Sequence, residues 1–120
     1  MRARLAIQSA GINVQLREIL LSDKAPNFLV ASPKGTVPVV VTHNEVIEES
    51  LDIMRWALDL ADPEGWLKMP DAGYDWISRN DSKFKEAIDH IKYFVRYPNL
   101  DLRIERETAT EILHDLNIQV

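Results

Sequence analysis

Pro38 is the residue that most constrains how this chain can fold, because it stands second in the β-prone run Val37–Thr42. Valine and threonine favour strands, but proline has no backbone N–H to donate to a strand ladder. Two alternatives remain open. Either the run is an edge strand with a trans proline, or it is entered through a cis proline that turns the Val37 backbone outward. Because cis bonds make up only about 5–6% of X–Pro bonds in folded proteins, the residues around Pro38 do not by themselves favour the cis alternative.

The other elements of the first half are predicted from apolar periodicity and from turn residues. The His43-Asn44 connection fits a tight hairpin, since Asn tolerates positive φ. Gly11 reads as a helix stop, and Ser22-Asp23 reads as a helix cap. Together these signals predict helices at residues 3–10, 25–31 and 51–61, and strands at residues 14–19, 37–42 and 45–47.

Beyond residue 62 the pattern is helical only. Apolar residues at helical spacing run from Phe84 to Val95 and mark one face of a helix. Thr108 and Glu111 form a capping box for a last helix. The chain is therefore predicted to have an α/β domain followed by a partial helical domain, at residues 1–62 and 63–120.

Glu49 and Ser50 stand where the helix at residues 51–61 begins. The plainer interpretation is a serine cap beside an acid that the helix dipole favours. The alternative is an anchor for the polar end of an amino acid. The helix N-terminus and the Ser50 hydroxyl would hold a carboxylate, and Glu49 would hold an ammonium group. Together with an outward-facing Val37 backbone, this pair could hold the far end of an extended peptide.

Composition argues against several functions. The chain has no Cys, which excludes disulfides, thiolate metal sites and CxxC redox cycling. Its net charge of −5 gives no electrostatic reason to bind nucleic acid or anionic lipid. The three His residues are isolated, so no metal site is predicted.

Apolar runs fall far short of the roughly 20 residues of a membrane span, and the amino terminus does not resemble a secretory signal. A cytoplasmic protein is expected.

Two segments, PKGTVPVVV at residues 33–41 and VIEESLDIMRWAL at residues 46–58, resemble the thioredoxin-like amino-terminal domain of glutathione transferases. The first twelve residues resemble that family's first helix, and FKEAIDHIKYFVRYP resembles the start of its helical domain. In the family, the residue before a cis proline pairs with the cysteinyl part of glutathione, and an acidic–serine pair binds the γ-glutamyl end. The resemblance implies glutathione as ligand or co-substrate, contacted by Val37, Pro38, Glu49 and Ser50, with Lys34 reaching the glycine carboxylate.

The chain departs from the family pattern at its ends. The family's first strand, with its catalytic Cys, Ser or Tyr, would precede Met1, so no residue here takes the catalytic position. Ser9 lies at the far end of the first helix and is a poor substitute. The resemblance thus implies a thioredoxin-like domain without its first strand, followed by a short all-helical segment. Such a protein is expected to bind glutathione with little or no transferase activity, and to lack most of the acceptor pocket.

A missing first strand would leave two unpaired sheet edges, at residues 14–19 and 37–42. The gap could be filled by a strand from a second chain, by direct closure of the two edges, or by the chain's own tail at Leu102–Glu105 or Leu116–Val120. Exchange between copies is favoured, which predicts a homo-oligomer such as a strand-exchanged dimer. The competing interpretation is a non-catalytic assembly protein whose open edge pairs with another chain.

Overall fold

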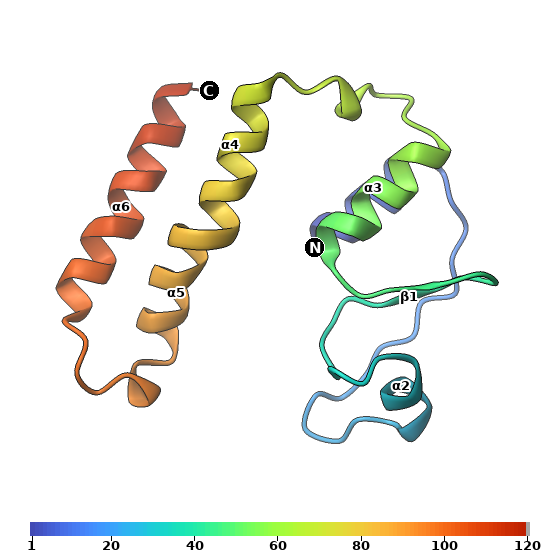
Figure 1. Cartoon of the computed structure of the whole chain (residues 1–120), viewed down its shortest axis with the longest axis horizontal. Helices are drawn as coiled ribbons and strands as arrows, with labels where there is room; N and C mark the ends of the chain where they lie inside the picture. The colour runs from blue at the N-terminus through green and yellow to red at the C-terminus, as the bar shows by residue number, and fades with distance from the viewer. Residues whose placement is uncertain (120) are drawn as a thin grey trace. The chain divides into compact units, whose positions relative to one another are not determined.

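The computed structural model describes residues 1–119, and the chain divides into two compact units, one covering Met1–Lys68 and one beginning at Met69 (Figure 1). The first unit combines helices with a small two-stranded sheet, and the second unit is built of helices. The predicted fold class, an α/β part followed by an all-helical part, is confirmed.

The first unit contains the three helices that the sequence predicts, each within a residue or two of its expected bounds. Gly11 follows the first helix with φ +65°, a conformation that glycine adopts without strain and that ends the helix. Pro26 opens the second helix at a position where its missing N–H costs nothing. The elements are α1 (Arg2–Ser9), α2 (Pro26–Ala31), β1 (Val40–Val41), β2 (Val46–Ile47), α3 (Ser50–Leu60) and the 3₁₀ turn η1 (Trp66–Lys68).

The core of the first unit lies between α1 and α3. Ala3 and Ala6 are buried on one face of α1, and their small side chains let the two helices approach closely. Ile47 of β2 completes the cluster around Ala3 and so ties the sheet to the helix pair. The residues that α3 buries are Ile53, Ala57 and Leu58. Because this core is small, each buried side chain carries a large share of the unit's hydrophobic stabilisation.

The hairpin formed by β1 and β2 is antiparallel, with Val40 opposite Ile47. Its turn is held by Thr42, whose hydroxyl oxygen accepts from the backbone N–H groups of Asn44 at 3.2 Å and Glu45 at 3.0 Å. The predicted hairpin is confirmed, although its strands are shorter than expected. The predicted positive φ at Asn44 is wrong, since no non-glycine residue within 1–119 has one. The threonine hydroxyl organises this turn instead.

Two other local predictions in the first unit are wrong. Residues 14–19 form no strand, because no other strand in the described chain lies beside them to complete a ladder. The Ser22-Asp23 pair does not cap α2, whose N-cap is Ala25 without a side-chain bond. Asp23 instead takes part in an isolated bridge with Leu20.

The second unit is a helical hairpin. A nearly continuous helical segment is made of α4 (Asp71–Arg79), a π-helical turn η2 (Asn80–Phe84) and α5 (Lys85–Lys92), and it runs beside α6 (Leu102–Gln119) (Figure 1). A short 3₁₀ turn, η3 (Phe94–Arg96), lies in the connection. The residues buried in this unit are Ala87, Ala109 and Ile112. Arg79 and Asp115 join the two arms by a 2.6 Å ion pair.

Three expectations for the second unit are corrected. The last helix begins at Leu102, so Thr108 and Glu111 lie inside it and do not form its capping box. The cap is Asp101, whose carboxylate accepts from the backbone N–H of Arg103 at 2.9 Å. Val95 is exposed in η3 and does not belong to a buried face. The tail segments considered as strands, at residues 102–105 and 116–119, are helical, while Val120 lies outside the described residues.

Candidate functional site

The β1–β2 hairpin places the two halves of the predicted ligand site at one end. The strand ladder ends at the pair Val40–Ile47. Val37 and Pro38 precede Val40 by three and two residues. Glu49 and Ser50 follow Ile47 by two and three residues. The antiparallel hairpin therefore brings the segment before β1 to the same end as the start of α3.

The first half of the site is the segment that enters β1. The Val37–Pro38 peptide bond is cis, the second of the two alternatives for Pro38. Val37 is 51% exposed, and within the described chain its backbone N–H and C=O form no hydrogen bond. An exposed, unpaired peptide unit can accept one edge of another extended backbone.

The second half of the site is the start of α3. Glu49 is the N-cap residue by position, but it makes no side-chain cap bond, and Ser50 is already the first helical residue. The interpretation of Ser50 as the cap is therefore wrong. Its hydroxyl oxygen instead accepts a 2.9 Å hydrogen bond from Nε of Arg2 on α1. A hydroxyl that accepts one hydrogen bond keeps its O–H as a donor.

An ion pair joins the two halves. Lys34 Nζ lies 3.4 Å from Glu49 Oε1, and both side chains are more than half exposed. An exposed pair of this kind contributes about 0–1 kcal/mol to stability, so ligand charges can compete for either partner. The arrangement thus offers an anion, a cation, a hydroxyl and an unpaired peptide unit, which match the groups of a short zwitterionic peptide.

Three residues near the site were not predicted from the sequence. Arg2 contacts Ser50 across 48 positions of the chain, and no local pattern signals such a contact. Ser32 Oγ donates a 2.6 Å hydrogen bond to Glu48 Oε1. The only sequence signal for this pair was that Ser32 and Glu48 stand close to Lys34 and Glu49.

Nucleophile candidates are poorly placed for thiol chemistry. Ser9, at the last turn of α1, donates to Glu64 Oε1 at 2.9 Å. Ser50 accepts from Arg2. The sequence supplies no Cys. The described part of the first unit therefore offers no residue placed for proton abstraction from a thiol.

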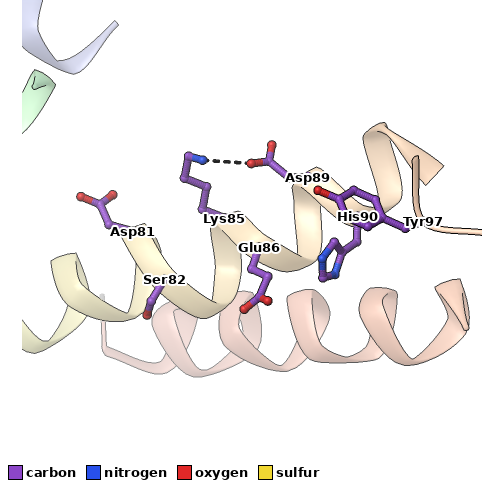
Figure 2. A pocket seen from close by; sticks show the side chains of 7 residues that line it. All are labelled: Asp81, Ser82, Lys85, Glu86, Asp89, His90 and Tyr97. Atoms are coloured by element: carbon purple, nitrogen blue, oxygen red, sulfur yellow. Dashed lines mark hydrogen bonds and ion pairs between the residues drawn. The ribbon is translucent and has the colours of Figure 1, made fainter. Parts of the chain in front are cut away.

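A second, open hollow lies on the helical unit beside η2 and α5 (Figure 2). Lys85 and Asp89 close on one another there by a 2.9 Å ion pair, and the hydrogen bond from Lys85 to Asp89 is the main cause that raises the pKa of Lys85. His90 stacks edge-on with Tyr97 at 4.5 Å between ring centroids. None of the sequence-predicted site residues lines this hollow.

Two absences within residues 1–119 concern metal ions and membranes. No group of three or more His, Asp or Glu side chains is arranged to hold a metal ion. No helix in that range is both long and apolar enough to cross a membrane.

The comparison with known families matches the first unit. The model of the glutathione S-transferase N-terminal domain covers residues 1–65, which is more than half of the 120 residues. The matched stretch includes α1, both strands of the hairpin and α3, and so contains every residue of the site described above.

Proposed function

The chain belongs to the glutathione S-transferase family, and from this membership we propose that its amino-terminal part, residues 1–62, binds glutathione. In this proposal the Val37 backbone, beside Pro38, pairs with the cysteinyl peptide unit. Glu49 receives the γ-glutamyl ammonium group, and Ser50 receives the adjacent carboxylate. Lys34 receives the glycine carboxylate at the other end.

The observation that carries the proposal is the unpaired peptide unit of Val37 at the same end of the hairpin as the Lys34–Glu49 pair. Glutathione at neutral pH has two carboxylates, one ammonium group and an extended backbone. An acid, a cation and an open backbone edge complement these groups. Reduced glutathione is held in the cytosol, so we propose that the protein acts there.

We further propose that this chain has little or no transferase activity of its own. Conjugation requires glutathione sulfur as a thiolate near neutral pH, whereas a free thiol has a pKa of about 8.5. A positioned donor must stabilise that thiolate. The Ser9 hydroxyl already donates to Glu64, and in this proposal the free O–H of Ser50 is used by the γ-glutamyl carboxylate, so neither serine serves as that donor. In this proposal the protein therefore binds glutathione without catalysing its conjugation.

Calorimetric titration with reduced glutathione tests the binding proposal. The wild-type protein is expected to bind with a Kd in the millimolar range or tighter. Glu49→Ala is expected to weaken binding by at least tenfold, because it removes the partner of the ligand's ammonium group. Glu45→Ala, at an exposed position in the hairpin turn, is the matched control and should bind like wild type. No detectable binding by a folded wild-type protein would refute the proposal.

A second candidate function is assembly through the open sheet edge. It is favoured by residues 14–19, which form no ladder within the described chain and include the exposed apolar residues Val14 and Leu16. A homo-oligomer in which copies exchange strands would pair this segment. The two proposed functions differ in what pairs with the exposed backbone of Val37. It is glutathione if the protein binds this ligand, and the backbone of a second chain if the protein assembles.

A further inference from the structure

Ser32 is the most buried polar residue of the first unit. It follows α2 as its C-cap, and none of its surface is exposed. Its backbone N–H donates to Phe28 O at 2.8 Å, and its carbonyl accepts from Gly35 N at 2.8 Å. Ser32 therefore ends α2 and begins the tight turn that carries Lys34. Gly35 closes that turn with φ +62°.

Glu48 occupies the corresponding position before the second half of the site. It follows the buried Ile47 of β2 and directly precedes Glu49. Its half-buried carboxylate accepts the 2.6 Å hydrogen bond from Ser32 Oγ, a length typical of a hydroxyl bonded to a charged carboxylate. Such bonds are stronger than bonds between neutral groups and have a narrow preferred geometry.

The Ser32–Glu48 bond thus links the two loops that carry all of the proposed ligand contacts. Lys34, Val37 and Pro38 follow Ser32, and Glu49 and Ser50 follow Glu48. The neighbouring Lys34–Glu49 pair is exposed and must open when its partners turn to a ligand. The partly buried hydrogen bond from Ser32 to Glu48 needs no such rearrangement, because neither group is a proposed ligand contact.

We propose that Ser32 and Glu48 are positioning residues, whose hydrogen bond fixes the spacing between the two loops and thereby sets the affinity for glutathione. The inference rests on the proposed glutathione binding. A ligand that engages both loops at once gains most when the loops are already held at the right separation. Without the bond, part of the binding free energy is spent on holding the loops in place.

The inference is tested by titrating three variants with reduced glutathione: Ser32→Ala, Glu48→Ala and the double variant. The titrations are run at a temperature where circular dichroism shows each variant to be folded. Each single substitution should weaken binding by about tenfold, equivalent to 1.4 kcal/mol. The double variant should be no worse than either single variant, since both remove the same bond. Glu48→Gln keeps an acceptor oxygen and should retain affinity within about threefold.

Matched controls are Ser22→Ala and Glu45→Ala, both exposed residues of the same unit, which should bind like wild type. A purely structural role would lower the melting temperature of Ser32→Ala and leave the affinity of the folded protein unchanged. That result would overturn the inference. So would additive losses in the double variant, or a Glu48→Gln variant as weak as Glu48→Ala. A wild-type protein that fails to bind glutathione would overturn the proposed function, and with it the inference.

Discussion

At the scale of single residues, the proposed site is made of side chains that bond to one another in the free protein. Lys34 and Glu49 are paired, and Arg2 donates to Ser50. A binding site with mutually satisfied charges avoids repulsion in the free protein, but the ligand must then replace those contacts. The contribution of each residue to affinity is therefore the free energy of its contact with the ligand minus that of the contact it replaces.

Lys34→Gln tests the contribution of the cation. The melting temperature should change little, because an exposed ion pair contributes about 0–1 kcal/mol. Affinity for glutathione should fall severalfold, and affinity for glutathione esterified at its glycine carboxylate should be unaffected. Lys68→Gln serves as a control for the loss of one positive charge. Equal effects on the two ligands in the titration would mean that Lys34 only neutralises Glu49 and does not contact the ligand.

The same scale shows which site residues the sequence could predict. The local sequence predicts that four of the proposed site residues lie close together, because a short hairpin joins the segments that carry them. These residues are Val37, Pro38, Glu49 and Ser50. Arg2, Ser32 and Glu48 act through contacts between distant segments, 48 and 16 positions apart. Propensity and periodicity describe neighbours within a few positions and therefore miss such pairs.

At the scale of elements, the stability of the first unit depends mainly on the packing of α1 against α3. Ile53 on α3 is fully buried and contacts the cluster containing Ala3 and Ile47. Ile53→Ala should lower the free energy of unfolding by about 2–5 kcal/mol, through lost burial and the cavity left behind. Leu60→Ala, exposed on the same helix, should cost less than 1 kcal/mol. Chemical denaturation of both variants would check the difference, and similar losses would place the core elsewhere.

The start of α6 gives a prediction that depends on pH. Hydrogen bonds from the Arg103 side chain, and then from its backbone N–H, lower the pKa of the Asp101 carboxyl from its ordinary 3.8. Its stabilising effect is therefore complete above pH 3.8 and is lost as pH falls through the lower pKa of the folded state. Asp101→Ala should lower the melting temperature by roughly 2–4 °C at neutral pH. In thermal melts followed by circular dichroism, the difference should vanish in strong acid, and a constant difference would contradict the capping role.

Helices were easier to predict than strands because their signals are local. The bounds of α1, α2 and α3 follow from apolar spacing and from Gly11 and Pro26. The expected strand at residues 14–19 alternates correctly, but a strand exists only when another backbone pairs with it. The capping-box pattern at Thr108 predicts the start of α6 too late, because the true cap, Asp101, lies about two turns earlier.

At the scale of the whole molecule, many large apolar side chains remain exposed. Val14, Leu16 and Val41 are among them, and Val41 lies on β1 of the hairpin. Isolated exposed apolar residues are normal, but a segment of alternating apolar residues without a ladder is a surface on which a second chain can add a strand.

Sedimentation of the purified protein tests association between copies. A mass of about twice 13.8 kDa is expected at micromolar concentrations and above. Leu16→Asp should shift the protein towards the monomer, because a charge on the exchanged segment would be buried without a partner. Leu113→Asp is the matched control, since Leu113 is an exposed leucine of the helical unit. A wild-type monomer at high concentration would contradict strand exchange.

The unpaired segment at residues 14–19 has one more consequence, which concerns proteases. Arg17 lies at its centre, is exposed, and stands in backbone that makes no hydrogen bond within the described chain. Trypsin cleaves after arginine where the chain can be drawn into its cleft, and exposed loops offer that freedom. By contrast, both carboxylate oxygens of Asp62 hold backbone N–H groups at 2.8 Å just before Lys68. Digestion of the free chain should therefore begin at Arg17, and a partner strand seated on this segment would shield it from the enzyme.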